Sequence, residues 1–198
     1  GPVPQEGMPA LWNSYINVAS VDDTISKVEA AGGSVLMPAM DVITSGRMAF
    51  VADPTGAAIG VWEPKDHTGA GLVNEDGALT WNELMTDDIA AAQAFYSAAF
   101  GWTAEVNDMP GGFQYTTYKV GDDMIAGMME KQPQMAGVPN NWGVYFAVDD
   151  CDGCAGKIKE LGGSLMQEPF DTPIGKMAVA ADPQGAAFMV VQMNQPGE

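Results

Sequence analysis

The chain repeats itself: residues 32–61 read GGSVLMPAMDVITSGRMAFVADPTGAAIGV, and residues 162–190 read GGSLMQEPFDTPIGKMAVAADPQGAAFMV. The two stretches align from end to end with a single one-residue gap. The register continues upstream at one constant offset, over three matched pairs: Trp12 with Trp142, Tyr15 with Tyr145, and Val18 with Val148. Biased composition does not preserve register over such a length, so we interpret the match as an internal duplication.

Each copy has the same predicted order of elements. In the first copy, a strand over 13–18 precedes a helix that begins near Asp22-Asp23 and ends at Gly32-Gly33. Acidic residues favour the first turn of a helix, and glycine favours the position just past its end. Three strands follow, and an Asp-Pro-x-Gly turn precedes the last; we place the strands at 34–37, 47–52 and 57–62. The predicted unit is therefore β-α-β-β-β, and the later copy repeats it from residue 143 onward.

A divergent unit lies between the two copies. It is predicted to hold a strand over 80–85, a helix over 88–100 ended by Gly101, and strands over 112–120 and 124–129. The polar, glycine-rich stretch 64–76 reads as a linker.

The excess of acidic residues limits the kinds of molecule that the chain is expected to bind. The chain has 198 residues, with 26 acidic residues against 8 basic ones and a formal net charge of −18. Such a surface repels phosphate backbones and anionic lipid, so nucleic acid and membrane are poor candidate partners. No apolar run approaches the length of a membrane span, and no signal peptide is visible. We therefore expect a cytoplasmic protein.

The repeated pattern resembles the vicinal-oxygen-chelate superfamily of glyoxalases, bleomycin-resistance proteins and extradiol dioxygenases. The resemblance rests on the β-α-β-β-β unit, the helix-Gly-Gly ending, the Asp-Pro-x-Gly turn, and the motif that runs from Trp81-Asn82-Glu83-Leu84-Met85 to Phe100-Gly101-Trp102. It implies an α+β fold in which two β-α-β-β-β units pair into a curled mixed sheet, a cup over a ligand with helices outside.

This pairing rule predicts the domain organisation. Residues 77–198 are expected to form a complete glyoxalase-like module from units 77–130 and 141–193. Residues 1–63 are expected to be the second half of an N-terminal module, followed by the linker 64–76. A lone half leaves a sheet face uncovered, so we expect either a preceding unit or a second copy of the chain, in a homodimer, to complete it.

The resemblance also implies where a metal would bind. In the family, the ligands are a His or Gln in each first strand and a Glu in each last strand. The matching positions here are Asn13, Trp81, Gly143, Gly60 and Met189. None supplies the imidazole, carboxylate or thiolate that transition metals prefer. We therefore predict no metal and no cofactor in the module over 77–198; a preceding unit could supply His and Glu to the first module, with Asn13 as a weak third ligand.

Strand alternation predicts which side chains line the cup. They are apolar or aromatic, with one carboxylate: Asn13, Tyr15, Gly60, Trp62, Trp81, Glu83, Met85, Gly143, Tyr145 and Met189. Such a lining suits a flat or apolar small molecule. Buried there, Glu83 is a candidate general acid or base. The alternative is a structural role in an ion pair with Lys119 or Lys176.

Two basic residues and two cysteines each allow both a structural and a functional interpretation. Arg47 and Lys176 occupy equivalent strand positions, where they either hold an anionic ligand group or pair with surface acids, and the second reading is preferred. Cys151 and Cys154 form a CxxC at a helix N-terminus, where thiolates are stabilised. No thioredoxin-like pattern surrounds them, so we interpret them as ordinary helix residues, with a redox role as the alternative.

Three functions are compatible with these observations. The first is a metal-free protein that binds a small apolar or aromatic molecule, as in the bleomycin-resistance branch. The second is an enzyme of the same superfamily, a lyase, isomerase, hydroxylase or dioxygenase type, that uses Glu83 or a metal in the N-terminal module. The third is an acidic interaction or regulatory protein that binds a basic partner. The sequence favours the first.

Overall fold

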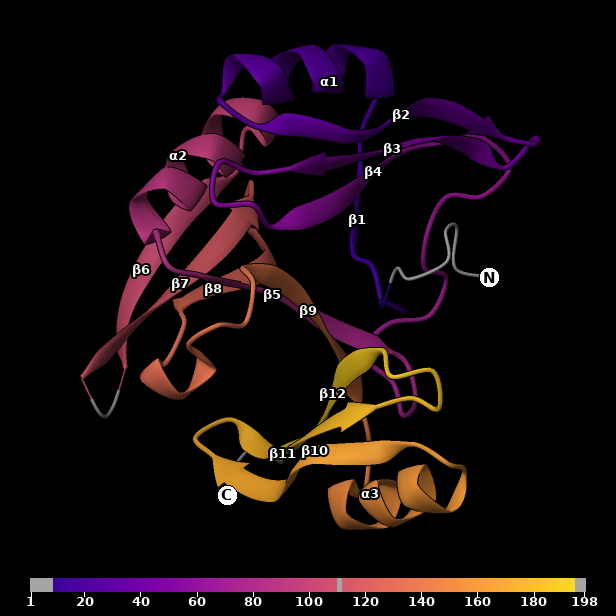
Figure 1. The fold of residues 1–198 in the computed structure, drawn as a ribbon, viewed down its shortest axis with the longest axis vertical. Helices are drawn as coiled ribbons and strands as arrows, with labels where there is room; N and C mark the ends of the chain where they lie inside the picture. Colours follow the sequence, from indigo (N-terminus) through magenta and orange to yellow (C-terminus); the bar gives the residue numbers. More distant parts are fainter. Residues whose placement is uncertain (1–8, 110–111, 195–198) are drawn as a thin grey trace. The chain divides into compact units, whose positions relative to one another are not determined.

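The computed structural model describes residues 9–109 and 112–194 and contains three β-α-β-β-β repeats (Figure 1). The first holds β1 (Tyr15–Asn17), α1 (Val21–Ala30), β2 (Ser34–Val42), β3 (Gly46–Ala52) and β4 (Ala58–Pro64). The second holds β5 (Leu79–Thr86), α2 (Ile89–Phe100), β6 (Thr103–Met109), β7 (Phe113–Val120) and β8 (Asp123–Glu130). A 3-10 turn (Pro133–Met135) leads to the third, with β9 (Asn141–Ala147), α3 (Cys151–Glu160), β10 (Ser164–Thr172), β11 (Gly175–Ala181) and β12 (Ala187–Met193).

The strands form two mixed sheets. One has the order β1-β4-β3-β2, and the other has the order β10-β11-β12-β9-β5-β8-β7-β6. In each repeat the first strand runs parallel to the last, while the remaining neighbours within the repeat are antiparallel. The α+β fold of repeated units, with two units joined in one mixed sheet, is confirmed. Among the described residues, no helix has the length and apolar character needed to cross a bilayer.

Local sequence explains how the helices begin and end. Ser20, Asp88 and Asp150 cap the three helices, and each side chain accepts a hydrogen bond from the backbone N–H three residues later. Such caps satisfy donors that have no partner within the helix. Gly101 ends α2 with a φ of 71°, in the left-handed region that glycine enters without steric cost.

The strand predictions missed two features for identifiable reasons. The sequence predicted a strand over 34–37 in the first repeat, but β2 continues through Pro38 to Val42. Proline is tolerated there because β2 is an edge strand whose pairing with β3 contains register shifts. Strand β6 was not predicted, because its sequence TAEVNDM is polar, as an edge strand of the eight-stranded sheet can be.

Contacts between residues divide the chain into two compact units. The larger unit contains residues 13–69 and 82–142, and the smaller unit contains the described residues 9–12, 70–81 and 143–194. This grouping differs from the predicted modules, because packing joins α1 of the first repeat to α2 of the second. The hydrogen-bonded sheet instead follows the second and third repeats. The module boundaries at residues 63 and 77 therefore stay a prediction.

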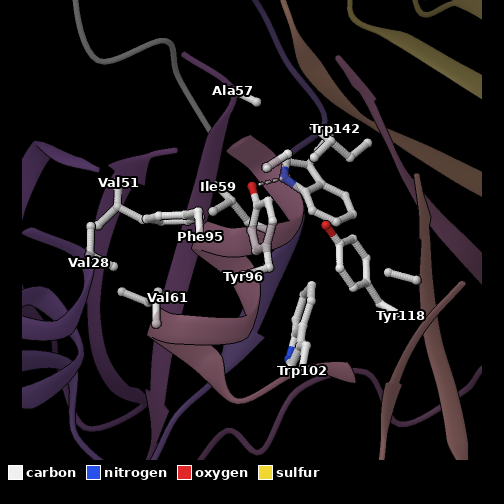
Figure 2. Packing of buried hydrophobic residues seen from close by; sticks show 14 of the residues in the cluster. Val28, Val51, Ala57, Ile59, Val61, Phe95, Tyr96, Trp102, Tyr118 and Trp142 are labelled. Carbon is white, nitrogen blue, oxygen red and sulfur yellow. Dashed lines mark hydrogen bonds between the residues drawn. The ribbon is translucent and has the colours of Figure 1, made fainter. Parts of the chain in front are cut away.

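The core of the larger unit is built on contacts between α1, α2 and the strands beneath them (Figure 2). Val28 and Val51 are fully buried, and Phe95 is 1% exposed. The predicted glycine pair after α1 is explained by this packing. Gly32 has a φ of 86°, while a Cβ on Gly33 would lie 2.6 Å from the Phe95 ring and 2.7 Å from the carbonyl oxygen of Ala52.

A buried chain of hydrogen bonds crosses this core, and Figure 2 shows its link between Trp142 and Tyr96. The indole Nε1–H of Trp142 donates to the Tyr96 hydroxyl at 2.8 Å, and that hydroxyl donates to Asp53 Oδ2 at 3.1 Å. The other carboxylate oxygen of Asp53 accepts the backbone N–H groups of Thr55 and Ala57, within the Asp-Pro-x-Gly turn. Every polar atom named here is therefore satisfied away from water.

The titration of Tyr96 is consistent with its role as a donor. Burial, followed by the nearby carboxylate of Asp53, raises the pKa of Tyr96 well above its ordinary value. The hydroxyl therefore keeps its proton at neutral pH and can donate it to Asp53.

Replacing Tyr96 tests the stabilising role of this chain. We expect Tyr96→Phe to lower the free energy of unfolding by about 2–4 kcal/mol, because it leaves both the Asp53 carboxylate oxygen and the Trp142 indole N–H buried without a partner. Urea unfolding monitored by circular dichroism measures the change.

Tyr118→Phe is the matched control. Tyr118 is also fully buried, but its hydroxyl contacts the Met128 sulfur at 3.3 Å, a weak acceptor. Removing this hydroxyl should lower the free energy of unfolding by less than about 1.5 kcal/mol. Equal costs for the two variants would contradict the assignment.

Candidate functional site

The first repeat gathers three of the predicted lining residues on one sheet face. Tyr15 of β1 and Gly60 of β4 are direct partners in the parallel register. The Tyr15 ring lies edge-on to Trp62, with centroids 6.5 Å apart, and edge-on to Phe50 at 5.4 Å. We call Tyr15, Phe50, Gly60 and Trp62 the Tyr15 face. Asn13, also predicted to line the site, precedes β1 and is exposed.

Gly60 is required by the position of the Tyr15 ring. A Cβ at residue 60 would lie 2.3 Å from Tyr15 Cδ1 and 2.5 Å from Cε1, closer than carbon atoms approach without displacement. The space that a longer side chain would need is therefore filled by the phenol ring. Partial burial also raises the pKa of Tyr15, so its hydroxyl stays protonated and can donate a hydrogen bond at neutral pH.

Trp62 is held in place by the loop that follows β4. Its indole Nε1–H donates to the carbonyl oxygen of His67 at 2.9 Å, and the two rings lie edge-on with centroids 5.9 Å apart. The sequence placed His67 in the linker and gave it no role. The structure places it beside the Tyr15 face, which strand periodicity cannot show because the contact depends on the path of the loop.

The third repeat presents an equivalent set within the smaller unit. Tyr145 of β9 and Met189 of β12 are register partners, as Tyr15 and Gly60 are in the first repeat. They form one cluster with Val191, against which Trp81 and Met177 also pack. We call Trp81, Tyr145, Met177, Met189 and Val191 the Met189 face. Gly143 precedes Tyr145 by two residues in β9 and is buried.

Glu83 and Met85 lie on β5 in the larger unit. Glu83 is 7% exposed and pairs in register with Gly127 of β8, while Met85 pairs with Met129. The two lysines considered as partners for Glu83 form ion pairs elsewhere. Lys119 contacts Glu105, and Lys176 contacts Asp152 at 2.6 Å. An acid–base role for Glu83 stays a prediction.

The structural reading of the two repeated basic residues is confirmed. Arg47 contacts Asp22 at 3.0 Å and Asp41 at 3.4 Å, and Lys176 makes the equivalent contact with Asp152 of α3. These carboxylates are largely exposed, so the pairs contribute little to stability.

The CxxC pair shows no sign of thiolate activation. Cys151 is fully buried, and Cys154 is half-buried. Burial is the main cause that raises the pKa of both thiols. Because thiolates are the reactive form, the raised pKa disfavours redox chemistry at neutral pH.

The metal positions implied by the family pattern do not fit an ion. Gly60 and Gly143 have no side chain, Trp81 has no acceptor, and Met189 has only a thioether. Adding a carboxylate at residue 60 would require the Tyr15 ring to move. Across residues 9–109 and 112–194, the structure brings together no group of three or more His, Cys, Asp or Glu side chains suited to holding a metal.

Sequence reasoning missed a cleft in the larger unit. It has a volume of about 400 Å³ and is lined by Ser14, Tyr15, Ile16, Asn17, Ile59, Asn82, Trp102, Val120, Asp123, Ile125, Ala126 and Trp142. The prediction followed alternate residues such as Asn13 and Trp81, whereas Ser14 and Asn82 lie one position further along each chain segment. In β5 a period of two places Asn82 on the face opposite to Trp81 and Glu83. Tyr15 is the one predicted lining residue that also lines this cleft.

A family model and two related proteins match most of this chain. The family model described as "Glyoxalase/Bleomycin resistance protein/Dioxygenase superfamily" matches residues 1–61 and 78–190. A Mycobacterium tuberculosis protein named "Putative glyoxylase CFP32" is 50% identical over 188 residues, which cover 94% of this chain and 71% of that protein. The "Anthracycline biosynthesis protein DnrV" of Streptomyces peucetius is 42% identical over 191 residues, covering 96% and 69%.

Solved structures share the fold at low sequence identity. A Mn(II)-bound glyoxalase from Novosphingobium aromaticivorans has a TM-score of 0.60 and 18% identity, covering 90% of this chain and 61% of that one. The 2,2',3-trihydroxybiphenyl 1,2-dioxygenase of Sphingomonas wittichii strain RW1 has a TM-score of 0.60 and 14% identity, covering 96% and 73%.

Substituting Gly60 tests the close approach of Tyr15. We expect Gly60→Ala to lower the free energy of unfolding by about 1–3 kcal/mol, the usual cost of overpacking. The same change in a Tyr15→Ala background should cost clearly less, because the ring that the methyl group meets is gone. Denaturant unfolding of the four proteins of this cycle measures the coupling.

Gly156→Ala is the control for the glycine substitution. Gly156 lies within α3, and a Cβ there meets nothing within 4 Å. Alanine should therefore leave stability unchanged or raise it by about 0.5–1 kcal/mol. A Gly60 cost that persists in full without the Tyr15 ring would refute the steric explanation.

Thiol alkylation tests the two cysteines. Because the folded pKa values are raised, we expect iodoacetamide to modify the native protein slowly at pH 7–8 and faster only as the pH rises above the ordinary thiol range. Mass spectrometry of the tryptic peptide reports each site against free cysteine as the reference. Rapid modification at pH 7 would indicate an activated thiolate and would support a redox role for the CxxC pair.

Proposed function

We propose that this chain, which belongs to the glyoxalase/bleomycin resistance protein/dioxygenase superfamily, binds a flat, largely apolar aromatic molecule without using a metal ion. The observation that carries this proposal is the Tyr15–Gly60 pair. At the position where the family pattern places a metal-binding glutamate, this chain has a glycine whose side-chain space is filled by a phenol ring. The position offers an aromatic edge in place of an oxygen ligand.

The side chains of the two faces suit such a ligand. Edge-to-face and offset contacts between aromatic rings contribute roughly 0.5–1.5 kcal/mol each beyond simple burial. Tyr15 is 46% exposed, so much of its ring is available for contact. Its protonated hydroxyl can donate to a carbonyl or phenolic oxygen. On the Met189 face, the thioethers of Met177 and Met189 adapt to ligand shape at little energetic cost.

The similar proteins support this class of ligand. The name of the Streptomyces peucetius protein places it in anthracycline biosynthesis, and anthracyclines are fused-ring aromatic compounds. By contrast, the Novosphingobium glyoxalase is Mn(II)-bound, and its 18% identity supports a shared fold alone. We therefore draw the ligand class from the lining residues and from the Streptomyces peucetius relative, which is 42% identical.

An enzymatic role is the second candidate, and the burial of Glu83 favours it. Glutamate is seldom buried in folded proteins, and Glu83 in β5 is only 7% exposed. Burial of this kind is one way in which enzymes prepare a general acid or base. The reaction type would be that of a lyase, isomerase, hydroxylase or dioxygenase of the superfamily.

Titration with 1,4-dihydroxyanthraquinone tests the binding proposal. This flat phenolic ketone should quench tryptophan fluorescence with saturable binding, equally in protein dialysed against EDTA and in protein supplied with Mn²⁺ or Ni²⁺. Tyr15→Leu and Met189→Ala should each weaken binding about tenfold if their face forms the site, which corresponds to about 1.4 kcal/mol. Phe113→Leu, which replaces an exposed aromatic ring outside both faces, is the matched control.

Two results would count against the proposal. One is binding that appears only when a transition metal is supplied. The other is an affinity that neither Tyr15→Leu nor Met189→Ala changes relative to Phe113→Leu.

Glu83→Gln separates the two candidate functions. The amide keeps the shape of the side chain but can no longer act as an acid or base. If the protein converts a substrate through Glu83, we expect turnover to fall by about 10²-fold or more while ligand binding persists. Unchanged turnover in a variant that folds normally would remove Glu83 from the mechanism.

A further inference from the structure

The cleft in the larger unit has the size and lining of a small-molecule site. Its volume of about 400 Å³ falls within the range of about 300–1,000 Å³ that is typical of ligand pockets. It is lined by residues of β1, β4, β5, β7 and β8, by Trp102 between α2 and β6, and by Trp142 near the start of β9. Of its polar residues, Asn82 lies on the face of β5 opposite to Trp81 and Glu83, and Ser14 precedes β1.

The polar side chains of the cleft keep donors and acceptors that can form hydrogen bonds to a ligand. The Ser14 hydroxyl donates to Asn82 Oδ1 at 2.6 Å, which leaves the Asn82 amide N–H groups as donors and the Ser14 oxygen as an acceptor. Asn17 Nδ2 donates to the carbonyl oxygen of Thr68 at 3.1 Å, leaving Asn17 Oδ1 as an acceptor. Asp123 adds an exposed carboxylate. The cleft therefore offers more acceptors than donors.

The apolar wall of the cleft is rigidly supported. Trp142 is fixed by its hydrogen bond to Tyr96 at 2.8 Å. Trp102 stacks on the same tyrosine ring, with centroids 5.3 Å apart and an interplanar angle of 15° (Figure 2). Ile59 and Ala126 are each 2% exposed and complete the wall. A wall held in this way is ordered before a ligand arrives, which lowers the cost of binding.

We propose that this cleft binds a hydroxylated ring compound of sugar-like chemistry, either uncharged or carrying one amine. Hydroxyl groups satisfy the surplus acceptors of Ser14, Asn17 and Asp123, and a ring or hydroxyl oxygen accepts from Asn82. The C–H face of the ring packs on the apolar wall. An anionic ligand is disfavoured by Asp123 and by the formal net charge of −18. This site is separate from the proposed aromatic-ligand function, although Tyr15 contributes to the lining of both.

Tryptophan side chains allow the site to be located directly. The chain contains five tryptophans, so the ¹H–¹⁵N spectrum has five indole signals that can be assigned by substitution. Millimolar methyl glucopyranoside, glucosamine and glucuronate form a series of similar rings that differ in charge. We expect glucosamine to shift the signals of Trp102 and Trp142 in a saturable way, the neutral glycoside to do so more weakly, and glucuronate to have the least effect.

Paired variants connect these shifts to the cleft. Val120→Trp places a bulky side chain in the lining and should abolish the saturable shifts, whereas Val106→Trp changes a similarly exposed β6 residue outside the cleft and should preserve them. Asp123→Asn should remove the preference for glucosamine over the neutral glycoside. Asp122→Asn, at the adjacent turn position outside the lining, should retain it.

Three outcomes would overturn the proposal. The first is the absence of saturable shifts with all three probes in the natural chain. The second is shifts confined to Trp62 or Trp81, which would place the probe on the Tyr15 or Met189 face. The third is equal loss of binding in Val120→Trp and Val106→Trp when both fold normally. None of these outcomes bears on metal-independent binding of aromatic molecules, which is measured with a different probe.

Discussion

The hydrogen-bonded chain from Trp142 through Tyr96 to Asp53 is the interaction around which the larger unit is organised. It joins an indole, a phenol and a carboxylate that come from the start of β9, from α2 and from the turn between β3 and β4. Each group would be costly to bury alone, and each is satisfied by the next. Because the carboxylate also fixes the Asp-Pro-x-Gly turn, the same contact positions β4 and therefore Gly60 and Trp62 of the Tyr15 face. The indole and phenol rings also support the wall of the cleft.

The Tyr15 face and the cleft share one short segment, residues 14–17, which contains β1. Around β1, Tyr15 presents its ring to Gly60 and Trp62, while Ser14 reaches Asn82. The Tyr15 face is aromatic, whereas the cleft holds paired polar side chains beside an apolar wall, and Tyr15 contributes to both. The chemistry of the ligands should differ accordingly, with flat apolar rings on the first and hydroxylated rings on the second. Strand geometry thus allows one short segment to contribute to two different surfaces.

Membership of the superfamily does not decide the chemistry of this chain. The fold is shared with a Mn(II)-bound glyoxalase and with a dioxygenase, but function depends on the residues at the site. The positions at which the family resemblance implies metal ligands carry an amide at Asn13 and otherwise glycine, indole and thioether groups. At Gly60 even a Cβ would meet the Tyr15 ring. A metal-free site is therefore a proposal that rests on these residues and not on the fold.

From the sequence alone we predicted the repeated β-α-β-β-β order, the ends of the helices, and the pairing of Arg47 and Lys176 with surface acids. These features depend on local rules, namely capping, glycine conformation, alternation and an internal match in register. The sequence also predicted that Tyr15, Gly60 and Trp62 share a face, because a period of two is set by the backbone. Strand β6 and the continuation of β2 past Pro38 were missed, since edge strands tolerate polar residues and proline.

The folded structure was needed to show that the first and second repeats pack together through α1 and α2. It was also needed to show that Tyr96 connects Asp53 to Trp142. It also revealed the contact of His67 with Trp62 and the cleft beside Ser14 and Asn82. These features bring together atoms from segments that are distant in sequence, and their positions depend on packing volume and on buried hydrogen bonds. A local pattern contains no information on either.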